Sequence, residues 1–220
     1  MQNNKSQSEQ VQSTQKQKSK VAEFFTAKRL AKLGIFSAVA VALYFINVPI
    51  AFLFPSFLEL NLSDLPILIG GFALGPVSGA IIALVRYLIK LPFSGTMTVG
   101  ELSDLINSLA FVLPASIIYY RNKTKKRAVI GIIIGAVCSV GVALLSNRFV
   151  VVPFYLELFF KGNLDVLVGV CSIIPGINSA NFYGYYILFA ALPFNALRVV
   201  IVGTVTVIVY KRISNLLNKM

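Results

Sequence analysis

The sequence contains no histidine and only two cysteines, Cys138 and Cys171. These absences exclude catalysis by histidine and leave too few ligands for a zinc site of the Cys/His type. The chain also lacks the motif GxxxxGKS/T, so it has no phosphate-binding loop with which to hydrolyse ATP. We therefore expect no catalytic residues, no metal site and no resident cofactor.

Acidic residues are few, with 8 Asp and Glu against 20 Lys and Arg, which gives a net charge of +12. Fifteen of the 20 basic residues lie in three clusters that flank apolar runs: seven up to Lys32, five in the segment RNKTKKR (121–127), and three after Tyr210. This arrangement is typical of the cytoplasmic ends of membrane helices. We expect lipid headgroups, and no nucleic acid, beside these clusters.

Long apolar runs dominate the rest of the chain. Hydrophobic residues make up 57% of the sequence and the mean hydropathy is +0.80, whereas soluble domains are roughly 45–50% apolar. Uncharged runs such as 33–54 and 128–147 match the roughly 20 residues that cross a bilayer. The sequence predicts an all-α membrane protein, with a disordered polar and basic tail over residues 1–29 and one membrane domain over 30–220.

The basic clusters also predict the number of spans. If all three lie in the cytoplasm, an even number of crossings must separate each pair. Gly75 and Pro76 interrupt one apolar stretch, which makes four crossings possible before RNKTKKR. Six transmembrane helices with cytoplasmic N- and C-termini are therefore expected, over about 33–54, 62–75, 76–91, 100–120, 128–150 and 185–210. Most acidic residues, and the long segment 151–184, then lie on the outer side of the membrane. We expect ligand recognition on that side.

The segment PFNALR (193–198) places a charge inside the last predicted helix. An arginine at the bilayer centre costs at least about 2.5–3.5 kcal/mol, so Arg198 should face a cavity or an acidic partner. Asn195 lies three residues earlier, on the same helical face. The alternative is a proline-kinked helix in which Arg198 pairs with an acid for packing alone.

Other polar residues form weaker candidates. Asn147, in SNRF, offers a paired donor and acceptor that suit the edge of a heterocycle, although a helix-end cap is the alternative. Residues 57–64 alternate apolar and polar side chains, which favours an extended loop over the cavity, with Ser63 or Asp64 capping the next helix. The set Glu101, Asp104 and Asn107 forms one polar stripe. Small residues at four-residue spacing, which favour close helix approach or internal packing, are Gly34, Ala38 and Ala42.

Four segments, in this order, resemble one known family: FLELNLSDLPILIGGFALGP (57–76), GTMTVGEL (95–102), SNRF (146–149) and PFNALR (193–198). Together they resemble the riboflavin-specific substrate-binding (S) component of energy-coupling factor (ECF) transporters. The resemblance implies the six-helix S-component fold in a prokaryotic plasma membrane. It also implies capture of riboflavin from outside, and docking on a module of one scaffold membrane protein and two ATPases.

The resemblance further implies roles for individual residues. Asn147, Asn195 and Arg198 would bind the polar edge of the flavin, with arginine here where the family carries lysine. The small-residue ridge on the first helix would dock on the scaffold protein. Further riboflavin contacts are expected from Leu60, Asn61, Leu62, Thr96 and Glu101. A binding component for another vitamin such as thiamine, a stand-alone secondary transporter and, last, a membrane enzyme are the alternatives.

Overall fold

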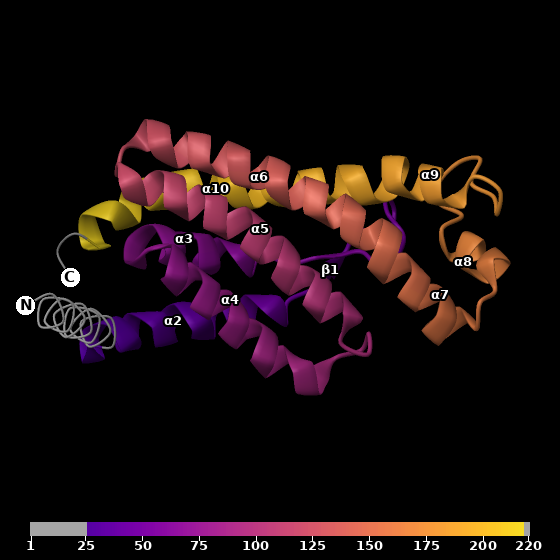
Figure 1. Cartoon of the computed structure of the whole chain (residues 1–220), viewed down its shortest axis with the longest axis horizontal. Helices are drawn as coiled ribbons and strands as arrows, with labels where there is room; N and C mark the ends of the chain where they lie inside the picture. Colours follow the sequence, from indigo (N-terminus) through magenta and orange to yellow (C-terminus); the bar gives the residue numbers. More distant parts are fainter. Residues whose placement is uncertain (1–25, 218–220) are drawn as a thin grey trace, which may run out of the picture.

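The computed structural model describes residues 26–217, and side chains over residues 26–209. The predicted tail, residues 1–29, lies almost wholly outside this range. The described chain is an elongated bundle whose long helices run mostly along one axis (Figure 1). These helices are α2 (Ala27–Tyr44), α3 (Asp64–Leu74), α4 (Pro76–Lys90), α5 (Val99–Arg121), α6 (Lys125–Ser146) and α10 (Leu192–Leu217).

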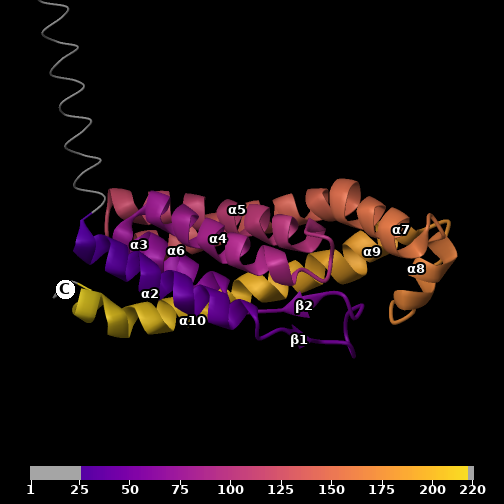
Figure 2. The same ribbon diagram turned by 90° about the horizontal axis from the view of Figure 1, so that it is seen from below.

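Smaller elements gather at one end of the bundle, which we call the hairpin end (Figure 2). The opposite end, which we call the basic end, carries the start of α2, the α3–α4 turn and the loop between α5 and α6 (Figure 1). The hairpin end comprises β1 (Val48–Pro49) paired antiparallel with β2 (Glu59–Leu60), η1 (Leu91–Phe93), α7 (Val152–Phe160), α8 (Leu164–Val170) and α9 (Phe182–Tyr186).

The helices α3 and α4 form a hairpin around Gly75 and Pro76. Gly75 adopts φ +99°, a conformation that glycine takes without strain, and Pro76 begins α4, where its missing N–H costs nothing. At 1.5 Å per residue, the 11 residues of α3 span only about 16 Å. The first turn of α3 therefore lies about half a bilayer thickness from the basic end, inside the bundle.

Two long helices contain a π-helical turn. Helix α6 continues through η2 (Asn147–Val151) into α7, and α9 continues through η3 (Ile187–Ala191) into α10. The fifth helix, predicted over about 128–150, therefore continues beyond its predicted end. Both π-helical turns overlap a sequence F-x-x-x-P-F, at 149–154 and 189–194. Each proline deprives the carbonyl four residues earlier of its partner, which is where a helix ladder changes register.

A helix lies in each of the six segments predicted to span the membrane, but not every helix is long enough to do so. Among the described residues, four stretches are long and apolar enough to cross a membrane: 76–93, 99–121, 125–160 and 182–209. Helix α3 is apolar but short. Helix α2 starts at Ala27, carries basic residues in its first turns and ends at Tyr44. It does not reach Phe54 as predicted, because strand β1 follows.

Two separate hydrophobic clusters stabilise the bundle. The larger joins α2, α3, α4, α5, α6 and α10, and includes Phe72, Phe111 and Val202, each at most 1% exposed. The smaller cluster joins α7, α8, α9 and η3 around Leu167, Phe182 and Tyr186. The centroids of the Phe182 and Tyr186 rings lie 5.7 Å apart. The polar residues described next lie where these two clusters meet.

Candidate ligand-binding site

A cavity opens in the hairpin half of the bundle, between the two hydrophobic clusters. The cavity and the open space at its mouth hold about 790 Å³ free of protein atoms. Aromatic side chains from four segments form its apolar walls: Tyr44, Phe57, Tyr155 and Phe194. The remaining walls are unusually polar for the interior of an apolar bundle.

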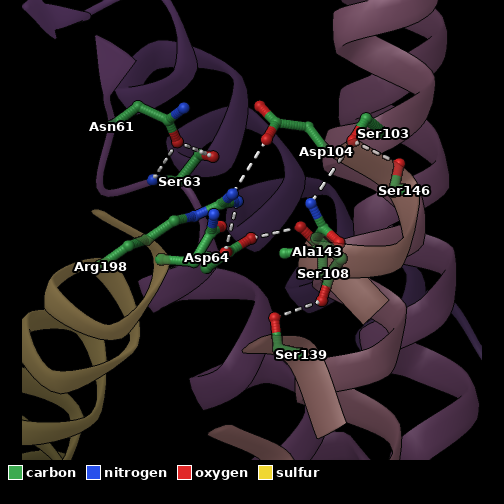
Figure 3. A network of polar contacts seen from close by, with 12 residues as sticks. Asn61, Ser63, Asp64, Ser103, Asp104, Ser108, Ser139, Ala143, Ser146 and Arg198 are labelled. Atoms are coloured by element: carbon green, nitrogen blue, oxygen red, sulfur yellow. Dashed lines mark hydrogen bonds and ion pairs between the residues drawn. The ribbon is translucent and has the colours of Figure 1, made fainter. Parts of the chain in front are cut away.

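Four charged side chains form a network beneath and beside the cavity. The Asp64 carboxylate on α3 accepts from Arg86 Nη1 of α4 at 3.0 Å through one oxygen and from Arg198 Nη2 of α10 at 2.8 Å through the other. Arg198 Nη1 also bonds Asp104 Oδ1 of α5 at 2.9 Å. Figure 3 shows Arg198 reaching from α10 between the two carboxylates. The network therefore links four helices.

Burial makes the pairing of these charges important for stability. Arg86 is 1% exposed, Asp64 2% and Arg198 5%. Transfer of a single charge to such a site costs several kcal/mol unless partners compensate it. Two arginines and two aspartates neutralise one another here. The hydroxyls of Ser63 and Ser108 add hydrogen bonds to Arg86, and Ser108 also donates to Asp64.

The guanidinium of Arg198 is held at the cavity wall by its carboxylate partners. It lines the cavity while Asp64 and Asp104 hold its two terminal nitrogens. Each terminal nitrogen has a second N–H, and Nε has no partner among the described residues. Arg198 was expected to face a cavity or an acidic partner, and in the structure it lines the cavity and pairs with two carboxylates.

Two side-chain amides lie in the wall near Arg198, and each is fixed by its own helix. Asn147 Nδ2 donates to the Ala143 carbonyl and Asn195 Nδ2 donates to the Ala191 carbonyl, both at 2.8 Å. Asn147 Oδ1 also accepts from the Tyr186 hydroxyl at 2.9 Å. Each amide keeps one N–H and an acceptor lone pair for a ligand.

Another part of the cavity wall contains a buried carboxylate. Glu101 is 5% exposed and accepts from Ser94 Oγ at 2.7 Å and from Thr96 Oγ1 at 2.6 Å. The loop that supplies these hydroxyls has positive φ at Met97 and Thr98, which non-glycine residues rarely adopt. The ammonium of Lys90 lies at the same wall, 4.3 Å from the centroid of the Phe45 ring.

The eight residues predicted to contact riboflavin divide into two groups. Six line the cavity: Asn61, Thr96, Glu101, Asn147, Asn195 and Arg198. The other two, Leu60 and Leu62, are not among its lining residues. Residues alternate sides in the extended segment, so Glu59 and Asn61 face the cavity, and Leu62 packs on the larger hydrophobic cluster.

The predicted ridge lies away from the cavity. Gly34, Ala38 and Ala42 are all exposed along one face of α2, whereas Leu33, Ser37 and Ala40 of the same helix are buried. These three small residues therefore do not pack inside the described chain.

The sequence-based prediction missed the network. Asp64 was expected to cap α3, but neither Ser63 nor Asp64 makes a side-chain cap bond. Arg86 was not considered, although an arginine within an apolar helix signals a buried partner as clearly as Arg198 does. Asn107 also lines the cavity, and its buried Oδ1 has no partner among the described residues. From sequence, Asn107 was included only in the polar stripe with Glu101 and Asp104.

Comparison with known proteins points to one family. Residues 28–210 match the family model "ECF transporter, substrate-specific component". The riboflavin transporter RibU of Staphylococcus aureus is 33% identical over 87% of this chain and 93% of its own length. The riboflavin transporter FmnP of Bacillus subtilis is 20% identical over 85% of this chain and 92% of its own length.

A solved structure agrees in fold. It is described as the S component of a bacterial ECF transporter, is 32% identical, and superposes with a TM-score of 0.66 over 86% of this chain and 97% of its own. Because the family model spans most of the chain, the protein belongs to the substrate-specific components of ECF transporters, a family of integral membrane proteins.

Proposed function

We propose that this protein is the riboflavin-binding subunit of an ECF importer. The observation that carries the proposal is the cavity wall formed by Asn147, Asn195 and Arg198, in a chain whose relatives are riboflavin transporters. The polar edge of a flavin ring alternates carbonyl oxygens with an N–H. Two amides and an arginine supply matching donors and acceptors.

The site also suits the rest of the riboflavin molecule. Aromatic walls fit a flat tricyclic ring, which buries large apolar area against them. In this proposal Thr96 and Glu101, which also line the cavity, bind the ribityl chain, whose hydroxyls are hydrogen-bond donors for a carboxylate. This orientation assigns Asn61 to the hairpin that covers the site, and leaves Leu60 and Leu62 supporting it.

For topology, we propose six spans with both termini in the cytoplasm. Six helices, α2 to α6 and α10, match the six apolar segments. Placing the basic end in the cytoplasm follows the positive-inside rule, because RNKTKKR and the start of α2 lie there together. The cavity then opens to the outside. Residues 30–220 form the binding domain in this proposal, preceded by a polar tail.

The energy comes from other polypeptides in this proposal. The chain has no ATP-binding motif, and members of its family are components of larger transporters. We propose that the exposed ridge of Gly34, Ala38 and Ala42 docks on a scaffold membrane protein associated with two ATPases. Small residues let a partner helix approach closely. Replacing Ala38 and Ala42 by Trp should abolish uptake and spare ligand binding. Val39→Phe, at an exposed position that points about 100° around the helix from Ala38, should spare both.

Ligand titration tests the function. The purified protein should quench riboflavin fluorescence saturably, with one ligand per chain, and excess thiamine should not compete. Absence of quenching, with saturable thiamine binding instead, would reject riboflavin in favour of the other vitamin. Uptake that persists in a host without any ECF ATPase would instead indicate a stand-alone secondary transporter.

A further inference from the structure

A second hollow lies in the other half of the molecule, along the seam between α6 and α10. We call it the α6–α10 groove; its walls include Val129, Ile133 and Ala136 of α6 and Val200, Gly203 and Ile208 of α10. It holds about 780 Å³ of space free of protein atoms. No charged residue lines it, and three of these side chains are more than half exposed: Ile133, Val200 and Ile208.

Small residues create the groove. The opposite face of α6 packs tightly on α5, where a Cβ at Gly131 would lie 2.6 Å from the Ala115 carbonyl oxygen. At the seam with α10, Gly203 lets Ile132 approach so closely that a Cβ there would meet it at 2.8 Å. Beside this contact Ala136 and Gly203 leave a channel that larger residues would fill. The channel runs along the helices, which is the direction of an acyl chain in a bilayer.

At the basic end the groove adjoins a second, apolar recess. The recess shares Val129, Ile132 and Val207 with the groove, and Phe72 and Lys125 also line it. Lys125 is exposed and contributes its aliphatic stem to the recess, so its ammonium lies at the surface end of an apolar wall.

The cations at this end have no internal counter-charge. The sequence contains no acidic residue between Asp104 and Glu157. Within the described part of the chain, no carboxylate lies at ion-pair distance from Lys125 or the exposed Lys126 and Arg127 that follow it. An anion from another molecule would therefore complete the site. An apolar channel beside unpaired cations, in a membrane protein, matches a phosphate headgroup attached to an acyl chain.

We infer that the α6–α10 groove and its recess bind one anionic phospholipid, with the phosphate at Lys125 and an acyl chain along Ala136 and Gly203. This inference does not depend on the ligand of the first cavity. The lipid would belong to the leaflet at the basic end.

Native mass spectrometry of the full chain tests this site. The protein is reconstituted in bilayers of equal parts phosphatidylglycerol and phosphatidylcholine, then released into detergent. We expect one retained phosphatidylglycerol per chain. Lys125→Gln should lower its retention about fivefold, the factor given by about 1 kcal/mol per basic residue near a membrane surface. Lys126→Gln, an identical change outside the recess, should lower it less.

A second pair of variants tests the channel. Ala136→Phe should displace the lipid, whereas Val137→Phe, on the next residue and outside the groove, should retain it. Size-exclusion profiles and melting curves of all four variants report whether each is folded. Equal retention of both lipids, equal effects within either pair, or a polypeptide bound in place of lipid would overturn the inference.

Discussion

The basic half and the hairpin half of this bundle are stabilised by different interactions. In the basic half, glycines and small residues bring α3, α4, α5 and α6 together, and the buried side chains are mainly apolar. In the hairpin half, buried ion pairs, amides and π-helical turns surround an open cavity. The comparison teaches that apolar packing builds the scaffold, while polar groups that are costly to bury are concentrated where a ligand can use them.

The largest expected effect comes from breaking the network at its shared carboxylate. Asp64→Asn leaves Arg86 and Arg198 buried with one negative charge fewer, which should destabilise the fold by about 3–5 kcal/mol. Thermal unfolding in detergent measures this. Glu157→Gln, an exposed acid of the same half, is the control. A melting temperature equal to that of the control would mean that the network contributes nothing to the hairpin half.

A substitution in the basic half tests packing in the same assay. Gly131→Ala forces a methyl group against the Ala115 carbonyl and should destabilise by about 1–3 kcal/mol. At Gly141 on the same helix a Cβ meets nothing within 4 Å. Gly141→Ala should therefore stabilise the helix by up to about 1 kcal/mol. Equal melting temperatures for the two variants would contradict tight packing of α6 on α5.

A smaller effect is expected from a single hydrogen bond in the hairpin half. Tyr186→Phe removes the hydroxyl that donates to Asn147 and should weaken riboflavin binding by about 1 kcal/mol, because the amide loses its fixed orientation. Fluorescence titration measures the change. Tyr185→Phe, on the exposed neighbour, should leave affinity unaltered. A loss as large in the control would show that the hydroxyl of Tyr186 has no specific role.

The smallest effect concerns a cysteine outside the candidate spans. Burial raises the pKa of the Cys171 thiol to about 12, so almost none of it is thiolate at pH 8. In a Cys138→Ala background, Cys171 should react with a water-soluble maleimide far more slowly than a cysteine introduced by Ser172→Cys, which is exposed. Rapid labelling of Cys171 would show that the smaller hydrophobic cluster opens readily.

Sequence patterns predicted the helical class, the break at Gly75 and Pro76, and a cavity or an acidic partner for Arg198, because hydropathy, glycine with proline, and charges in apolar runs act locally. The grouping of Asn147 with Asn195 and Arg198 came from the family resemblance. Sequence patterns did not predict which acids pair with Arg198. Asp64 precedes it by 134 positions along the chain, and only packing of α3 against α10 brings the two together. The continuation of α6 into α7 was also missed, because a proline inside a helix and a helix end look alike in sequence.

The central claim is that the polar cavity of the hairpin half binds riboflavin through its amides and arginine. Its most direct test is the riboflavin dissociation constant of Asn195→Ala against that of Asn122→Ala, an exposed asparagine at the basic end. The amide at 195 is buried and faces the cavity, so its removal should weaken binding by about 1–3 kcal/mol, while Asn122→Ala should match the unaltered protein. Equal affinity for all three proteins would contradict the claim.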